Sequence, residues 1–172
     1  MCPTPLKYTR YASPLGMMTL ACEATGGLVG AWFEGQRFYG GGLPLGAAVC
    51  ESTAALQMAA AWLDAYFAKR PTAELSLPPL APIGTPFRLA VWKLLLQIPY
   101  GKTTTYGDLS RRLREQGLAA SAQAVGGAVA HNPISIIIPC HRVWGANGQA
   151  VGYAPGIHRK WQLLRHEAAC LV

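Results

Sequence analysis

The sequence predicts an α+β protein of two domains, the first a small antiparallel sheet with a helix and the second mainly helical. Short β-favouring runs separated by turn residues fill the first third of the chain, at 6–12, 17–22 and 28–33. The stretch Ser76–Gly84 holds three prolines and a glycine, which is typical of a stiff connector. Beyond it, apolar residues recur at helical spacing.

These observations divide the chain into three parts. We expect an N-terminal sheet-plus-helix domain at 1–77, a Pro-rich linker at 78–84 and a C-terminal domain at 85–172. The first domain should also contain a helix from about Ser52 to Lys69, with Ser52 as its N-cap and Pro71 ending it. Its aromatic and aliphatic stripe has the spacing of a core face, and residues 1–75 show no pattern typical of catalysis.

Composition narrows the class of protein. The 172 residues are 51% hydrophobic and only 13% charged, which describes a compact globular protein. No apolar run reaches the roughly 18 residues of a membrane span, and the N-terminus lacks the layout of a signal peptide. We therefore expect a soluble, intracellular, cytoplasmic protein. Its five cysteines are scattered without CxxC spacing, which argues against a disulfide framework and against a metal site: Cys2, Cys22, Cys50, Cys140 and Cys170.

The positive charge lies entirely in the second half of the chain. Residues 1–84 hold five Lys/Arg and five Asp/Glu, whereas residues 85–172 hold ten Lys/Arg and three Asp/Glu. Solubility alone would explain a positive charge. Its concentration in one half suggests instead that this half meets a polyanion.

The basic half begins with three predicted helices. Thr85-Pro86 opens the first in the favoured order of cap and proline, and its apolar face runs to Ile98. A second helix over 106–114 and a third from Ser121 to His131 are joined by a short connection, which fits a helix-turn-helix. The third consists almost entirely of small residues, including two glycines. Such small residues allow close approach to another helix or to the floor of a DNA groove, with mostly sequence-independent binding.

The stretch Ile136–Val143 carries the predicted chemistry. Ile136–Ile138 is interpreted as a short buried strand that Pro139 ends. Cys140 and His141 follow as neighbours, and an imidazole that accepts the thiol proton would produce the nucleophilic thiolate. An ordinary buried thiol beside a surface imidazole is the competing interpretation. The Pro-Cys-His-Arg-Val context favours the nucleophile.

In these motifs the second half resembles the O6-alkylguanine-DNA alkyltransferase (methylated-DNA–protein-cysteine methyltransferase) family. The resemblance extends over about residues 84–168 in unbroken order. The matching pieces are Gly84–Phe87, Ile98–Lys102, Thr105–Gly107, Ala124–Ala128, Asn132-Pro133, Ile138–Val143, Gly152-Tyr153 and Leu163–Glu167. The N-terminal part agrees more loosely, as a small sheet with a helix.

The resemblance implies direct reversal of DNA damage. An alkyl group would pass from O6 of guanine, and possibly O4 of thymine, to Cys140 in one irreversible turnover, after the base is flipped out through the minor groove. His141 would remove the thiol proton through a water, Glu167 would orient His141, and Asn132 would stabilise the turn before the active site. Tyr106 would contact the phosphate beside the flipped nucleotide and assist protonation of the leaving group. No cofactor is implied, and the protein is expected to act as a monomer on double-stranded DNA.

The resemblance also assigns the surroundings of the site. DNA-binding positions are Tyr106, Gln123, Ala124, Gly126, Gly127, Ala128 and Arg142. Pocket positions are Val143, Tyr153, Ala154, Pro155 and Lys160.

The sequence departs from the family pattern at three positions. Gln123 stands where an arginine usually fills the gap left by the flipped base, which predicts weaker capture of the extrahelical state. Pro155 replaces a common glycine and is expected to stiffen the pocket loop. Trp161 stands where a polar residue is usual, and the sequence gives no reason for it.

Three other functions compete with alkyl transfer. A non-enzymatic binder of alkylated DNA would lack the cysteine. A Cys–His hydrolase would need an oxyanion hole, which nothing in the sequence marks. A transcription factor would read base sequence, for which the Ala/Gly helix is poorly suited.

Overall fold

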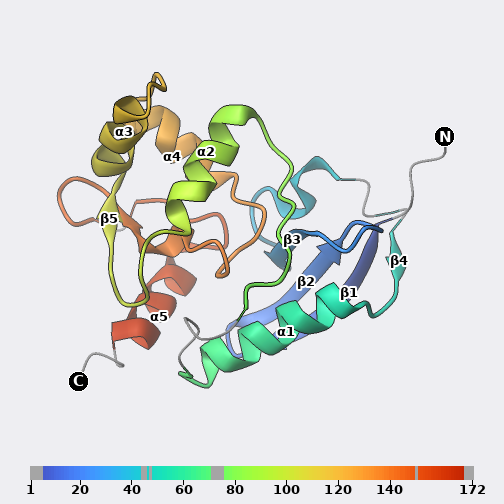
Figure 1. Cartoon of the computed structure of the whole chain (residues 1–172). Helices are drawn as coiled ribbons and strands as arrows, with labels where there is room; N and C mark the ends of the chain where they lie inside the picture. The colour runs from blue at the N-terminus through green and yellow to red at the C-terminus, as the bar shows by residue number, and fades with distance from the viewer. Residues whose placement is uncertain (1–5, 44–45, 47, 71–75, 150, 169–172) are drawn as a thin grey trace. The chain divides into compact units, whose positions relative to one another are not determined.

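The computed structural model describes residues 6–43, 46, 48–70, 76–149 and 151–168. The chain forms two compact units, Met1–Ile83 and Gly84–Val172 (Figure 1). Across the described residues, no helix combines the length and apolar character that a membrane crossing requires.

The first unit is an antiparallel meander with one helix against it. Strands β1 (Lys7–Ser13), β2 (Gly16–Cys22) and β3 (Leu28–Phe33) pair in sequence, from Lys7↔Cys22 to Ser13↔Gly16 and from Met18↔Phe33 onwards. The meander expected from sequence is confirmed. A fourth strand, β4 (Val49–Cys50), lies parallel to β1 and gives the order β3-β2-β1-β4. Two residues are too few for a periodic signal, so the sequence did not predict it.

Helix α1 (Ala54–Phe67) packs on this sheet. The prediction that Ser52 caps it was wrong, because Thr53 occupies that position and its hydroxyl accepts from the Leu56 N–H at 3.3 Å. Ser52 instead accepts from the side chain of Gln57 at 3.1 Å. The helix ends two residues before Lys69, which has a left-handed φ of 56°.

The second unit is mainly helical. It contains α2 (Pro86–Leu95), β5 (Thr104–Thr105), α3 (Tyr106–Glu115), α4 (Ala122–Ala130), β6 (Val143–Trp144) and α5 (Ile157–Ala168). The predicted caps Thr85 and Ser121 are confirmed, because each hydroxyl accepts from the N–H three residues on. Helices α2, α3 and α4 pack together, and the buried Trp92 indole donates to the Ala128 carbonyl at 2.9 Å. This bond fixes α4 against α2.

The predicted strand over Ile136–Ile138 is wrong. The segment is a tight buried turn, closed by a bond from the Ile138 N–H to the Ile134 carbonyl at 3.0 Å. Ile136 takes a left-handed φ of 72°, which a β-branched residue rarely adopts. Either a strand or a turn could bury these three side chains. The hydrogen bonds that the Asn132 side chain makes with the Ile138 carbonyl and the Ile134 N–H favour the turn.

A glycine in β3 provides a stability test of the first unit. A Cβ added to Gly30 would lie 1.8 Å from the Trp32 ring, whose side chain is 1% exposed and cannot move aside. We predict that Gly30→Ala lowers the free energy of unfolding by about 3 kcal/mol. Gly46→Ala is the control, because a Cβ there meets nothing within 4 Å, and its effect should stay below about 0.5 kcal/mol. Urea unfolding measures both, and equal effects would contradict the packing argument.

Candidate active site

Cys140 begins a single 3-10 turn, Cys140–Arg142, immediately after Pro139. Its side chain is 4% exposed, and the Asn132 amide donates to its sulfur at 2.9 Å. Burial raises the pKa of the Cys140 thiol, and the Asn132 hydrogen bond and the Lys160 charge offset this only in part. The resting group is therefore a thiol at neutral pH, and it needs a base to become a nucleophile.

The imidazole of His141 lies in a buried charge network. His141 Nε2 and Glu167 Oε1 are 2.6 Å apart, and both side chains are almost fully buried. Burial lowers the pKa of His141, although the Glu167 carboxylate acts in the opposite direction. The ring is thus neutral at neutral pH. With Nε2 donating to Glu167, the lone pair lies on Nδ1, which is the atom able to accept a proton.

Arg142 holds the Glu167 carboxylate from the other side. Its guanidinium donates to both carboxylate oxygens, at 2.9 and 3.0 Å, and to the Ile98 carbonyl at 2.6 Å. The Gly101 N–H donates to Glu167 as well, at 3.0 Å. Burial alone would raise the pKa of Glu167, but the hydrogen bonds from His141 and Arg142 and the charge of Arg142 outweigh it and lower that pKa. Glu167 is ionised throughout the physiological range.

Asn132 connects α4 to the cysteine. Its side-chain oxygen accepts from the Ile134 N–H at 3.0 Å, and its amide donates to the Ile138 carbonyl at 2.8 Å as well as to the thiol. The side chain thus spans the turn in which Ile136 has its unusual φ. This geometry fits the turn-stabilising role expected for Asn132 from the resemblance.

The side chains of Tyr106 and Lys160 both donate to the carbonyl of Val151, in the segment between β6 and α5. The Tyr106 hydroxyl donates to the Val151 carbonyl at 3.0 Å. The ammonium of Lys160, which has no exposed surface, donates to Val143 at 2.5 Å and to Val151 at 3.4 Å. Burial raises the pKa of Tyr106 to about 12 and lowers that of Lys160 to about 8. Tyr106 therefore stays a phenol, while Lys160 is mostly charged at neutral pH.

Of the other predicted pocket residues, Tyr153 lies near the thiol. The Tyr153 hydroxyl is buried near Cys140 and forms no hydrogen bond in this structure. Burial, and then the negative charge of a Cys140 thiolate, raise the pKa of Tyr153 well above its usual value. Val143 and Pro155 are buried and Ala154 is half-buried. The carbonyl of Pro155 accepts from Arg159 at 2.7 Å, which anchors the loop to α5.

Helix α4 separates the predicted DNA contacts into two groups. Gln123, Ala124 and Gly127 are exposed on one face, and Gly126 is half-buried with Tyr106 3.9 Å from the position of an added Cβ. Ala128 differs from its expected role as a surface contact. Its side chain is 3% exposed, and its carbonyl accepts from Trp92.

The structure also places Arg142 away from its expected position on the DNA-binding surface. The residue is 7% exposed, and its donors are engaged by Glu167 and Ile98. In this structure it supports the His141–Glu167 pair. The sequence offered no signal for this, because an arginine after Cys-His in a basic region is equally typical of a phosphate contact.

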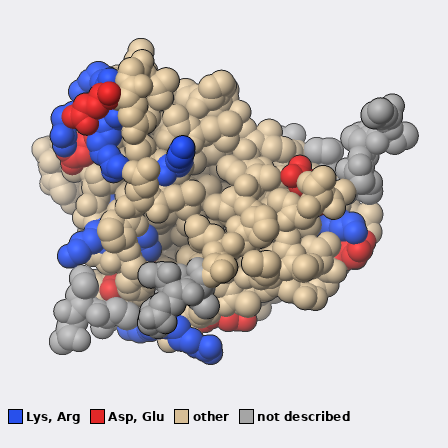
Figure 2. Space-filling view, viewed as in Figure 1, with Lys and Arg blue, Asp and Glu red and all other residues tan. Residues whose placement is uncertain are grey.

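Charged residues gather over particular helices of the second unit. Arg111, Arg112 and Arg114 project from α3, where Asp108 and Glu115 partly neutralise them. On the face shown in Figure 2, Lys and Arg atoms cluster around α3. In the described part of the chain, His, Cys, Asp and Glu side chains form no group of three that could hold a metal ion.

Two family models match the chain. Residues 86–169 match the model of the 6-O-methylguanine DNA methyltransferase, DNA binding domain, and residues 6–81 match that of the ribonuclease-like domain of the same methyltransferase. The methylated-DNA–protein-cysteine methyltransferase of Methanosarcina acetivorans is 38% identical over 165 residues, covering 95% of this chain and 99% of that protein.

Solved structures show the same likeness. The crystal structure of Mycobacterium tuberculosis OGT in complex with DNA has a TM-score of 0.78 and 38% identity, covering 95% of this chain and 93% of that one. The O6-methylguanine-DNA methyltransferase of Pyrococcus kodakaraensis has a TM-score of 0.65 and 25% identity, covering 94% and 98%. Both halves of the chain match these relatives, and the chain therefore belongs to the methylated-DNA–protein-cysteine methyltransferase family.

Proposed function

We propose that the protein repairs O6-alkylguanine in DNA by accepting the alkyl group on Cys140 in a single irreversible turnover. The observation that carries this is the buried thiol at the start of the turn that also presents His141, with Glu167 and Arg142 fixing the imidazole. The neutral His141, through Nδ1, takes the thiol proton directly or through a water. The thiolate then attacks the alkyl carbon.

The bond changes balance within the complex. A carbon–sulfur bond forms at Cys140 while the carbon–O6 bond of the base breaks, and the bonding electron pair stays on the guanine. Tyr106 donates a proton to the departing guanine, and the proton that His141 took from the thiol then restores the Tyr106 hydroxyl, so that the guanine leaves in its neutral form. A thioether has no leaving group that water could displace under these conditions, so the protein is consumed in the reaction.

The burial of Cys140 implies that the base comes to the protein. A sulfur in a side chain that is 4% exposed cannot reach an O6 atom inside a stacked duplex. The nucleotide must be flipped out, which costs a few kcal/mol. We assign the exposed face of α4, with Gln123, Ala124 and Gly127, to the groove from which the base leaves.

The Tyr106–Val151 hydrogen bond is expected to change during this step. In the free protein the Tyr106 hydroxyl is occupied by the Val151 carbonyl. To assist the leaving group it must exchange this partner for the substrate. Lys160 remains bonded to Val143 and Val151 and keeps the loop in place during the exchange.

The acceptor assignment predicts a stoichiometric mass change. Incubation with a duplex containing O6-methylguanine should add one methyl group per protein molecule, located on Cys140 by peptide mass spectrometry. Cys140→Ser should gain no mass, because a hydroxyl is far harder to ionise than a thiol. Cys22→Ser is the control, since Cys22 is also buried but bonds Thr53 in the other unit. Methylation of Cys140→Ser at the normal rate would refute the assignment.

Replacement of Glu167 should alter both stability and the pH dependence of the reaction. Glu167→Gln leaves Arg142 buried without its counter-charge, so we predict a loss of about 3 to 5 kcal/mol in the free energy of unfolding. The Glu167 carboxylate raises the pKa of His141, so its removal should move the acidic fall in methylation rate to lower pH and reduce the plateau. Single-turnover rates from pH 4 to 8 measure this, at a temperature where the variant is folded.

Two measurements separate the structural role of Glu167 from its effect on the His141 imidazole. The folded carboxyl has a lowered pKa, so its contribution to stability is present above the unfolded pKa of about 4.3 and is lost as pH falls through and below that value. Wild-type stability should therefore fall in acid, and that of Glu167→Gln much less. A lower rate with an unshifted pH profile would mean that Glu167 acts only as a structural anchor.

Gln123 predicts weak capture of the flipped state. Its amide is exposed on α4 and lacks the charge and planar fork of arginine. We predict that Gln123→Arg raises the second-order rate constant on duplex DNA by about tenfold, equivalent to about 1.4 kcal/mol. Gln162→Arg adds the same charge on an exposed position of α5 and should raise it far less. Equal gains in the two variants would show a purely electrostatic effect.

A further inference from the structure

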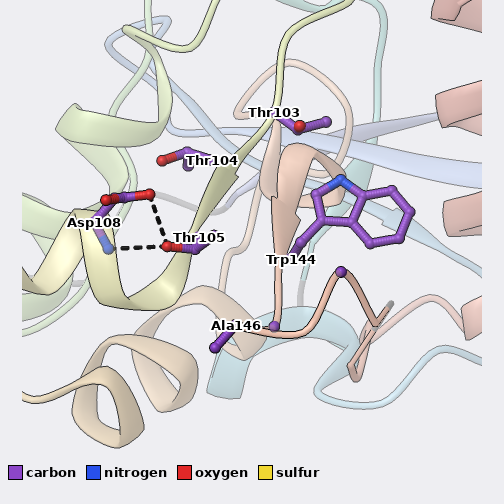
Figure 3. A pocket seen from close by; sticks show the side chains of 8 residues that line it. Thr103, Thr104, Thr105, Asp108, Trp144 and Ala146 are labelled. Carbon is purple, nitrogen blue, oxygen red and sulfur yellow. Dashed lines mark hydrogen bonds between the residues drawn. The ribbon is translucent and has the colours of Figure 1, made fainter.

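A cavity lies beside the acceptor site. It has a volume of about 390 Å³, within the usual range for small-molecule sites. Figure 3 shows Thr103, Thr104, Thr105 and Asp108 on one side and the indole of Trp144 on the other. The turn with Gly145, Ala146 and Gly148 completes the wall. The Cys140 chemistry derived above uses none of these side chains.

The strand pair connects this cavity to the acceptor site. Strands β5 and β6 lie parallel, with Thr104 opposite Val143 and Thr105 opposite Trp144. The next residue after β5 is Tyr106, and Val143 follows the Cys140–Arg142 turn directly. A strand of DNA that places one base at Cys140 therefore has the cavity within reach of a neighbouring nucleotide.

Asp108 has room for two more donors. The Thr105 hydroxyl donates to its Oδ2 at 2.8 Å, and Arg111 donates to its Oδ1 at 2.9 Å. Each carboxylate oxygen accepts about two hydrogen bonds, so one position on each remains. The hydrogen bond from Arg111, followed by that from Thr105, lowers the pKa of Asp108, which is therefore ionised at neutral pH. Two parallel N–H donors would occupy the two remaining acceptor positions of the Asp108 carboxylate.

The aromatic wall is held in one orientation. The Trp161 ring packs edge-on against Trp144, with centroids 5.2 Å apart and an interplanar angle of 74°. The Lys160 ammonium lies 5.9 Å from the centre of the Trp144 ring. This arrangement gives Trp161 a role that the sequence did not explain. A fixed indole is a stacking surface for a nucleobase, and such stacking is insensitive to base identity.

We propose that this cavity binds the guanine base of an unmodified nucleotide adjacent to the alkylated one. The inference rests on the proposed function, because it assumes that the damaged strand lies across the second unit. Guanine presents N1–H and the 2-amino group side by side, which matches the two open positions of Asp108. Its ring contacts Trp144, and the threonine hydroxyls bond its remaining polar edge.

The same chemistry excludes other occupants. No Lys or Arg is found among the described residues that line the cavity, and the ionised Asp108 repels a phosphate. O6-alkylguanine lacks the N1–H and would place a lone pair against the carboxylate. The cavity therefore rejects the lesion and selects ordinary guanine whose N1–H and 2-amino group are unpaired, so repair of single-stranded DNA should be faster where guanine flanks the lesion.

The first arm of the test uses free nucleosides. The indole N–H signal of Trp144, assigned with Trp144→Phe, is followed by NMR during titration with 2′-deoxyguanosine, 2′-deoxyinosine and thymidine. We expect 2′-deoxyguanosine to shift it, with an affinity at least threefold above that of 2′-deoxyinosine, which lacks the 2-amino group. Asp108→Asn should abolish this preference. Glu115→Gln should retain it, because Glu115 pairs with the same Arg111 at 3.7 Å but lies outside the cavity.

The second arm uses DNA. Single-stranded oligonucleotides carry one O6-methylguanine whose 5′ or 3′ neighbour is guanine, hypoxanthine or an abasic site. We expect methylation of Cys140 to be at least threefold faster with guanine on one side than with hypoxanthine. That ratio should fall to one in Asp108→Asn and persist in Glu115→Gln. Taking ratios within each variant removes the general effect of charge on DNA affinity.

The outcomes separate this inference from the proposed function. Methylation of Cys140 that ignores the neighbouring base in every oligonucleotide would overturn the guanine site and leave alkyl transfer intact. Binding of 2′-deoxyguanosine without any effect of the flanking base would overturn the assignment to the bound DNA strand. An equal loss in Asp108→Asn and Glu115→Gln would overturn the role of the Asp108 carboxylate. Absence of methyl transfer from every oligonucleotide would refute the proposed function itself, with the nucleoside titration still reporting on the cavity.

Discussion

The buried carboxylate of Glu167 is the interaction on which the second unit depends. It accepts from His141, from two donors of Arg142 and from the Gly101 backbone. These partners come from the active-site turn and from the segment after α2, while Glu167 itself comes from α5. A buried ion pair is weak evidence for net stability, since desolvation offsets most of the attraction. Its value here is geometric, because it gives the imidazole one orientation and one tautomer.

The environment of Cys140 reflects a balance between protection and reactivity. Burial keeps the thiol protonated and shields it from adventitious reagents, while Asn132, Lys160 and a neutral imidazole reduce the free energy needed to form the thiolate. In the proposed reaction, a flipped base that fills the pocket would exclude water from the thiolate and strengthen it as a nucleophile.

Small residues on α4 and the hydrogen bonds to the Val151 carbonyl both lie next to Tyr106. The glycines of α4 have no side chains, so a DNA groove can approach the exposed face of this helix closely. The hydrogen bonds from Tyr106 and Lys160 hold the loop that carries Tyr153. Tyr106 contacts both features, because its ring lies 3.9 Å from the position of a Cβ added at Gly126 and its hydroxyl donates to the Val151 carbonyl.

The sequence by itself determined the α+β class, the meander of the first unit, the caps at Thr85 and Ser121 and the Cys-His motif. These features depend on local spacing and on residues whose preferences are strong. Only the tertiary structure decided that Ile136–Ile138 forms a turn, that Ala128 faces α2 and that Arg142 supports Glu167. In each case the local preference is ambiguous. A β-branched run suits a strand or a buried turn, and an arginine suits a phosphate or a carboxylate, so the choice is made by hydrogen-bond partners that lie far away in the sequence.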